Sequence, residues 1–254
     1  MPIGKKSSEE LSIGKPAQPW FTSYSDLVTQ LLIFFVMLFA LSSAATEDQL
    51  KKLKEKIDRY TKENELQQFV STKITQKEGL IISFQEKYMF DSGKADIYEG
   101  AKKIIIDIMS LLKDEPNKIS IEGHTDNVPI STPEFPSNWE LSTARATNVL
   151  KLIIEEFKFD PKRFTASGYG ENMPESGILY SVIGSTPTTE FSPEEWKKVV
   201  ALCNDTPEKR SKNRRIDIVI KRLELDEMRT WRKKLAEVAR EKITHGGLVK
   251  VKPD

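Results

Sequence analysis

The longest apolar stretch of the chain lies near its N-terminus, where residues 27–46 carry no charged side chain. Twenty residues in a helix extend about 30 Å, which matches the hydrocarbon core of a bilayer. A cleaved signal peptide is the alternative, but its N-terminal region would be unusually long and would contain Glu9, Glu10 and Asp26. The pattern therefore predicts one uncleaved transmembrane helix, which we place at residues 23–46.

The charges beside this stretch favour one orientation. Lys5, Lys6 and Lys15 precede it, while Glu47 and Asp48 follow it directly. Basic residues favour the cytoplasmic side of a membrane, although further lysines soon after the stretch weaken the contrast. We therefore expect a single-pass protein of the inner or plasma membrane, with an extracytoplasmic C-terminal domain and a cytoplasmic tail at residues 1–22.

Residues 47–78 are highly charged and begin with a short amphipathic repeat. Leu50, Leu53, Ile57 and Tyr60 are three or four residues apart, so they share one face of a helix. The repeat is too short to predict a coiled coil. The segment is either a solvated spacer helix or a helix whose apolar face has a partner.

From residue 79 onward the pattern alternates between strands and helices. Short β-type runs are separated by stretches with apolar residues at helical spacing. We expect strands at residues 80–84, 118–122, 163–167 and 215–221, and helices at residues 97–113 and 139–157. This order predicts an α+β domain at residues 79–222, with helices packed on one side of a mixed sheet.

Two further segments interrupt or follow this order. The stretch between Pro174 and Asn204 reads as an insertion, with a short helix near Ser192 and with Cys203 as a buried or free thiol. Residues 223–254 are expected to form a charged helix and a loose tail.

Composition and motifs exclude several classes of protein. The chain of 254 residues has 39 Lys and Arg against 38 Asp and Glu, and this balance argues against nucleic-acid binding. One cysteine excludes an internal disulfide, and two histidines leave little material for a metal centre. Glu122, His124 and Asp126 alternate on one strand face, but no hydrolase motif accompanies them. We therefore expect neither an enzyme nor a bound cofactor or metal.

Asp26 stands where the apolar stretch begins, and two interpretations fit it. An acidic side chain is favourable at the positive end of a helix dipole. A carboxylate in a membrane also often marks an ion path, and Thr29 and Gln30 lie one turn further on, where they could share its polar face. Position and chemistry alone leave both interpretations open.

The sequence around Asp26 resembles the single transmembrane helix of flagellar motor stator B subunits, the MotB and PomB family. The matching positions are Trp20, Tyr24, Asp26 and Thr29, followed by the long apolar run. The resemblance implies that Asp26 binds the transported ion, H⁺ or Na⁺. It also implies a MotA-like polytopic partner, a homodimer of the B subunit, and contact with the flagellar rotor only through the MotA-like partner.

The same resemblance gives the segment after the span a specific role. In the stator family, an amphipathic helix at this position acts as a plug that closes the ion channel until the stator joins a motor. The residues that match the apolar face of such a plug are Leu50, Leu53 and Ile57.

Residues 79–222 resemble the OmpA-like peptidoglycan-binding domain. The motifs that carry this resemblance lie at residues 90–93, 122–126, 138–146, 168–171 and 213–216. The expected fold is an OmpA-like α/β sandwich, and the expected ligand is the peptidoglycan peptide. In many bacteria this peptide contains diaminopimelate, which carries both an ammonium and a carboxylate group.

The resemblance also assigns residues to that ligand. Asp126 can accept hydrogen bonds from an ammonium group, and Arg145 can form two parallel bonds with a carboxylate. These two positions match the binding pair of the family, and Asn138 and Arg214 are secondary candidates. Without the motifs, a surface ion pair or a turn cap would be the simpler interpretation of each.

Together these segments predict a stator B subunit that conducts ions with a MotA-like partner and is anchored to peptidoglycan. Two alternatives remain. A passive OmpA-like envelope tether would leave the pattern around Asp26 unexplained. An ExbD- or TolR-like energy transducer uses a similar aspartate, but those proteins lack the motifs at residues 138–146 and 213–216.

Overall fold

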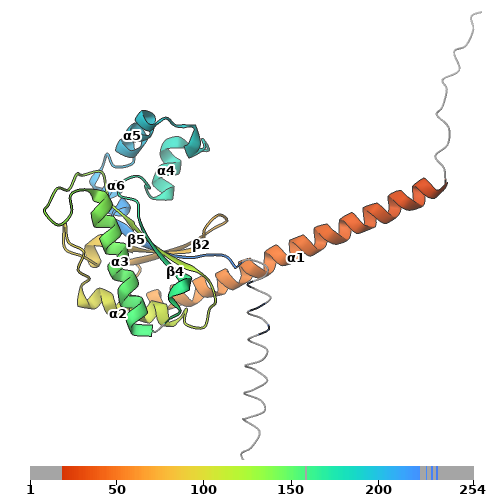
Figure 1. Cartoon of the computed structure of the whole chain (residues 1–254), viewed down its shortest axis with the longest axis horizontal. Helices are drawn as coiled ribbons and strands as arrows, with labels where there is room; N and C mark the ends of the chain where they lie inside the picture. Colours follow the sequence, from red (N-terminus) through yellow and green to blue (C-terminus); the bar gives the residue numbers. More distant parts are fainter. Residues whose placement is uncertain (1–18, 158, 224–226, 228–229, 231–232, 234–254) are drawn as a thin grey trace, which may run out of the picture. The chain divides into compact units, whose positions relative to one another are not determined.

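A computed structural model of the chain describes residues 19–157 and 159–223, together with 227, 230 and 233. It divides into two compact units, with the boundary after Ala45. One long helix, α1 (Pro19–Glu63), begins in the first unit and ends in the second (Figure 1). The cytoplasmic tail expected at residues 1–22 and the C-terminal helix expected at 223–254 lie almost entirely outside the described residues.

The first unit contains the segment predicted to span the membrane. Within α1, the stretch Trp20–Phe39 is long and apolar enough to cross a bilayer. Most of its large side chains, among them Phe34, Phe35 and Phe39, are more than half exposed. Apolar side chains in such a row are stable next to lipid or a partner helix, and not in water.

The second unit is built on a five-stranded mixed sheet with the strand order β1-β2-β5-β3-β4. Strands β3 and β4 are parallel, and the other neighbouring pairs are antiparallel. The four expected strands are present, and one more precedes them. The strands are β1 (Val70–Thr75), β2 (Gly79–Gln85), β3 (Ile119–His124), β4 (Phe164–Gly168) and β5 (Arg215–Ile220).

Two helices, α2 (Glu99–Ser110) and α3 (Asn138–Phe157), lie beside this sheet (Figure 1). The main core lies between these helices and the sheet. Alternate side chains of a strand point to one face. In β5 these are Ile216, Ile218 and Ile220, each at most 1 % exposed. They belong to one apolar cluster with Ile105 of α2 and Val149 of α3. The prediction of an α+β domain with helices packed on a mixed sheet is confirmed.

The second half of α1 also belongs to this core. Leu50 and Leu53 are 1 % exposed and Ile57 is 0 % exposed, in the same cluster as the sheet. Tyr60 Oη donates to Asp107 Oδ2 of α2 at 2.8 Å. Burial, together with Asp107, raises the pKa of Tyr60 to about 12. One compact unit begins at Thr46, so the second half of α1 and the sheet belong to the same unit.

The insertion forms a small helical unit with its own apolar cluster. It contains α4 (Ser176–Ile183) and α5 (Pro193–Leu202), and Ile178, Val199 and Cys203 pack together inside it. Ser192 caps α5, because its hydroxyl accepts from Glu195 N–H at 3.3 Å and Glu195 accepts from Ser192 N–H at 2.8 Å. The short helix expected near Ser192 is therefore present, and Cys203 is a buried free thiol.

Candidate functional site

The candidate site lies at one end of the central strands of the sheet, where β2 and β3 end and β5 begins. Because β2 and β3 both pair antiparallel with β5, their C-terminal ends meet the N-terminal end of β5. The register places Arg215 between Gln85 of β2 and His124 of β3. Glu86 directly follows β2 and Arg214 directly precedes β5, so the two residues lie at this same end of the strands.

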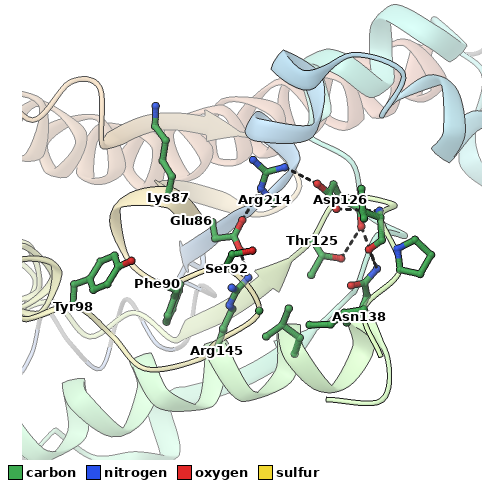
Figure 2. Close-up of a pocket in the computed structure, with 15 residues that line it drawn as sticks. Glu86, Lys87, Phe90, Ser92, Tyr98, Thr125, Asp126, Asn138, Arg145 and Arg214 are labelled. Atoms are coloured by element: carbon green, nitrogen blue, oxygen red, sulfur yellow. Dashed lines mark hydrogen bonds and ion pairs between the residues drawn. The ribbon is translucent and has the colours of Figure 1, made fainter. Parts of the chain in front are cut away.

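Helix α3 closes this end of the strands and completes a pocket of about 660 Å³. The helix approaches β3 closely because Gly123 has no side chain: a Cβ there would lie 2.1 Å from the carbonyl oxygen of Ser142. The pocket brings together all four residues that the sequence assigned to peptidoglycan, as Figure 2 shows: Asp126, Asn138, Arg145 and Arg214.

The charged side chains in the pocket form a continuous chain of ion pairs (Figure 2). Arg214 contacts two carboxylates, with Nη1 2.6 Å from Asp126 Oδ2 and Nε 2.7 Å from Glu86 Oε2. The other oxygen of Glu86, Oε1, is 2.6 Å from Arg145 Nη1. The formal charges of these two acids and two arginines cancel, so this group of four is neutral.

Arg145 is held rigidly at the bottom of this chain and is only 2 % exposed. Its Nε and Nη2 donate to the carbonyl oxygens of Lys94 and Asp91 at 2.8 and 3.2 Å. Its guanidinium carbon lies 4.9 Å from the centre of the Phe90 ring. Burial lowers the pKa of Arg145, and the neighbouring Glu86 opposes that shift. Arg145 is therefore a fixed, buried cation in the lining of the pocket, and each of its three guanidinium nitrogens already has a partner.

Asp126 is fixed by the loop that follows β3. Its Oδ1 accepts from the N–H of Val128 at 3.0 Å, which forms an Asx-type turn. Asn138 Nδ2 donates to the carbonyl oxygens of Asp126 and Val128 at 3.3 and 3.1 Å. Asn138 thus lines the pocket and also holds the loop that presents Asp126.

Glu86 is the member of the site that sequence reasoning missed. Its side chain is 12 % exposed and contacts both arginines. In the sequence it is one of 38 acidic residues and belongs to no motif that we recognised. The sequence feature that could have identified Glu86 is its position directly after β2. This strand ends on the same side of the sheet as β3, which precedes Asp126.

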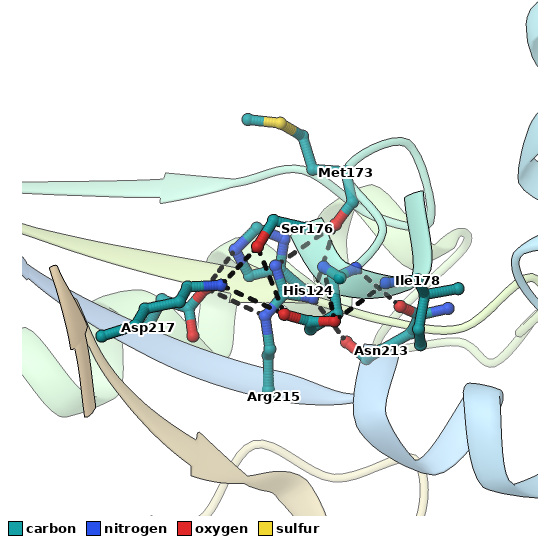
Figure 3. A network of polar contacts seen from close by, with 10 residues as sticks. His124, Met173, Ser176, Ile178, Asn213, Arg215 and Asp217 are labelled. Carbon is teal, nitrogen blue, oxygen red and sulfur yellow. Dashed lines mark hydrogen bonds and ion pairs between the residues drawn. The ribbon is translucent and has the colours of Figure 1, made fainter. Parts of the chain in front are cut away.

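A buried polar network adjoins the pocket through β5 (Figure 3). Arg215 Nε donates to Asp217 Oδ2 at 2.9 Å, and His124 Nε2 lies 3.5 Å from the same oxygen. Burial, and then Arg215, lower the pKa of His124 to about 3, so its imidazole is neutral at ordinary pH. The ring of His124 stacks on Tyr169 with their centres 5.4 Å apart. Across the described part of the chain, no group of His, Cys, Asp and Glu is arranged to hold a metal ion.

Asn213 fastens the insertion to the pocket (Figure 3). Its Oδ1 accepts from the N–H of Glu175 at 2.8 Å. Its Nδ2 donates to the carbonyl oxygen of Cys203 at 2.8 Å and to Asn204 Oδ1 at 2.9 Å. Both ends of the insertion are therefore tied to the residue that directly precedes Arg214.

Asp26, the candidate ion-binding residue of the first unit, accepts a side-chain hydrogen bond within α1. Gln30 Nε2 donates to Asp26 Oδ2 at 3.1 Å. The hydroxyl of Thr29 donates instead to the backbone carbonyl of Asp26 at 2.8 Å. Of the two residues expected to share a polar face with Asp26, only Gln30 contacts the carboxylate.

The expected plug residues are buried, but in the core of the second unit itself. Leu50, Leu53 and Ile57 pack with the sheet and its helices. In this conformation their apolar face is not available to close a channel. The plug role stays a prediction, and it requires this helix to leave the core.

Two protein families match separate parts of the chain. The family described as "Membrane MotB of proton-channel complex MotA/MotB" matches residues 4–59, and the OmpA family matches residues 89–177. Among curated proteins, Uncharacterized protein YtxE of Bacillus subtilis is 30 % identical over 240 residues, which cover 80 % of this chain and 88 % of that protein. Motility protein B of the same organism is 37 % identical over 178 residues, which cover 70 % of this chain and 58 % of that protein.

Solved structures with a similar fold come from two other bacteria. A MotB-like protein from Desulfovibrio vulgaris matches with a TM-score of 0.54 and 22 % identity, over 70 % of this chain and 94 % of that one. The cell wall anchor of the T6SS from Pseudomonas aeruginosa matches with a TM-score of 0.50 and 24 % identity, over 66 % of this chain and 97 % of that one. At these identities the likeness shows a shared fold.

Proposed function

The chain belongs to the family of MotB-like proteins with an OmpA domain, and from this premise we propose that it is the B subunit of a flagellar stator. The matched families are motility and envelope proteins, and the chain is not an enzyme. One combination of features carries the proposal. A lone carboxylate begins a charge-free span, and the same chain holds a pocket that pairs two acids with two arginines.

In this proposal Asp26 takes up H⁺ or Na⁺ from outside and releases it inside. One elementary charge that crosses a membrane potential of 100 mV releases about 2.3 kcal/mol. Occupancy changes the charge of Asp26 and therefore its contacts with neighbouring helices. A single span cannot enclose an ion path, so the proposal requires a MotA-like polytopic partner and a second copy of this chain. The rotor is turned through that partner.

The pocket would anchor the stator by exchanging ion pairs with diaminopimelate. Arg214 is the accessible arginine, with 34 % of its side chain exposed, and it now occupies the side of Asp126 that an ammonium group would contact. A ligand ammonium can replace Arg214 at Asp126. The released guanidinium can then turn to the ligand carboxylate beside Arg145. The ligand ammonium then pairs with Asp126, and the ligand carboxylate pairs with Arg214. No charged group is left without a partner during this exchange.

The ion role is tested by Asp26→Asn, which keeps the side-chain shape and removes the ionisable group. Cells with this variant should assemble flagella and fail to swim. Swimming speed of cells with the native chain, measured against external sodium and against an uncoupler, identifies the ion. Normal swimming by the Asp26→Asn strain would refute ion transport by this residue and favour a passive tether.

The anchoring role is tested separately with purified peptidoglycan sacculi. The Asp126→Ala and Arg145→Ala proteins should no longer sediment with sacculi, while Asp26→Asn should sediment like the native chain. Undiminished sedimentation of both pocket variants would count against this site. If the Asp26→Asn strain swims normally and anchoring does not depend on the pocket, an ExbD- or TolR-like transducer becomes the better interpretation.

A further inference from the structure

A second depression shares the loop between β3 and α3 with the candidate pocket. Its volume is about 470 Å³. The loop between β3 and α3 forms a wall of both hollows, with Val128 and Pro129 facing the pocket and Glu134 and Phe135 facing the second depression. The two hollows therefore share the loop between β3 and α3 and the first turns of α3.

The floor of this depression is an exposed tryptophan on α3. Trp139 is 49 % exposed, although it directly follows Asn138, which lines the pocket. The α-carbons of adjacent residues are about 3.8 Å apart. Beside the indole lies the backbone of Gly170, where a Cβ would be 3.7 Å from Trp139 Cδ2. The loop is held in place by Phe135, which is 5 % exposed and packs in a small apolar cluster.

The polar groups of the depression are two carboxylates, one hydroxyl and the indole N–H of Trp139, and its lining contains no cation. Ser137 donates to the carboxylate of Glu140 and lowers its pKa, so this group is ionised and accepts hydrogen bonds. Glu134 supplies a second set of acceptors, and Thr143 supplies a hydroxyl. This lining repels anions and suits a neutral ligand that donates several hydrogen bonds.

We propose that the depression around Trp139 binds a sugar ring of the peptidoglycan glycan strand, next to the pocket for its peptide. A pyranose ring is neutral, presents C–H groups to the negative face of an indole, and donates hydroxyls to carboxylates. The diaminopimelate residue is joined to the sugar by only a few residues, a span of about 10 Å when extended. The inference rests on the proposed anchoring function and assigns the glycan to a second subsite.

The test compares two ligands with the full-length chain in detergent, by calorimetry. One is an N-acetylmuramyl tripeptide that ends in diaminopimelate, and the other is the same tripeptide with an acetylated N-terminus in place of the sugar, so that the two ligands carry the same charge. The native chain should bind the muramyl form about three- to tenfold more tightly, the range expected for one aromatic stacking contact. Trp139→Ala should abolish this difference and keep the affinity for the bare tripeptide, and Trp139→Phe should retain most of the difference.

The matched control is Tyr180→Ala, which removes an aromatic side chain that is 64 % exposed on α4 in the insertion. It should keep the preference for the muramyl ligand. The inference is overturned if the native chain shows no preference, if Trp139→Ala keeps it, or if Trp139→Ala weakens both ligands equally. A preference that disappears in high salt would indicate a cation in place of a sugar, and would also overturn it. If the native chain binds neither ligand, the proposed anchoring function fails, and the glycan subsite fails with it.

Discussion

At the scale of single residues, the pocket depends on Glu86. Each of its carboxylate oxygens holds a different arginine, at 2.6 and 2.7 Å. Two guanidinium groups in one small volume repel each other, and a shared carboxylate offsets that repulsion. A glutamine at this position would keep the shape and remove the charge, so it isolates this electrostatic contribution.

We expect Glu86→Gln to weaken the binding of purified sacculi about tenfold and to lower the free energy of unfolding by about 1–3 kcal/mol, because Arg145 stays buried beside a neutral partner. Sedimentation with sacculi and chemical unfolding measure the two effects. Glu99→Gln is the matched control, because Glu99 is largely exposed and pairs with Lys102 on the surface of α2. Sacculus binding that is unchanged in Glu86→Gln would mean that the arginines are positioned without it.

His124 gives the second unit a defined response to pH. Its pKa is 6.5 in an exposed chain and about 3 in the folded one, chiefly because of burial. The unfolded chain therefore binds more protons between these two values, and stability falls as the pH falls through that window. The slope approaches about 1.4 kcal/mol per pH unit.

Replacing this histidine should flatten the response. We expect His124→Asn to lower the pH dependence of the unfolding midpoint between about pH 6.5 and 4, measured by circular dichroism of the full chain in detergent. Burial raises the pKa of Asp217, but Arg215 and His124 outweigh it and lower that pKa, so Asp217 contributes an acid-induced loss of stability at lower pH in both proteins. An equal slope in the two proteins above pH 4 would exclude His124 as the cause.

The site residues show what the sequence could and could not specify at this scale. Motifs identified Asp126, Arg145 and Arg214, and all three line one pocket. Their partners were not predictable, because the pairing of Arg214 with Asp126 depends on how the ends of three strands converge. For the same reason, Glu86 could not be predicted as a site residue before the order of the strands was known.

At the scale of elements, the second half of α1 is an integral part of the folded unit. Its apolar face was predictable from the spacing of Leu50, Leu53 and Ile57, but the partner of that face was not. An amphipathic repeat shows only that a face is covered. The edge strand β1 was missed for a related reason: its sequence VSTKIT is mostly polar and only Val70 in it is fully buried.

Truncation of this face tests where it packs. We expect Leu53→Ala to destabilise the second unit by about 2–5 kcal/mol, the usual cost of a cavity at a fully buried leucine. Chemical unfolding of the full chain in detergent measures the change. Glu55→Ala, at an exposed position of the same helix turn, is the control. A Leu53→Ala protein of native stability that leaks ions in cells would assign this helix to the channel alone.

At the scale of the whole molecule, the proposed function assigns ion transport and wall anchoring to separate units of the chain. Asp26 lies in the first unit, and the pocket around Asp126 lies in the second. The sequence predicted this division because a charge-free span and ordered motifs are both local signals. It did not predict where the second unit begins, since that boundary depends on tertiary packing of α1.

The division predicts that the two tasks can be lost separately. Asp26→Asn should retain full binding to sacculi, because it changes no residue of the second unit. Asp126→Ala should retain membrane insertion and its MotA-like partner in a co-purification from detergent extracts. Loss of sacculus binding in Asp26→Asn would show that the two units are coupled.

The chain of ion pairs in the pocket also bears on how firmly a cell wall can be held. Since Asp126 and Glu86 already have Arg214 as a partner, each contact with the wall replaces one that the protein possessed beforehand. The net gain of a single attachment is then small, and one attachment is readily reversed. A durable hold would come from avidity, with neighbouring copies engaging the same polymer at high effective concentration. If the proposed exchange of ion pairs holds, an individual subunit would detach from the wall without an enzyme to release it.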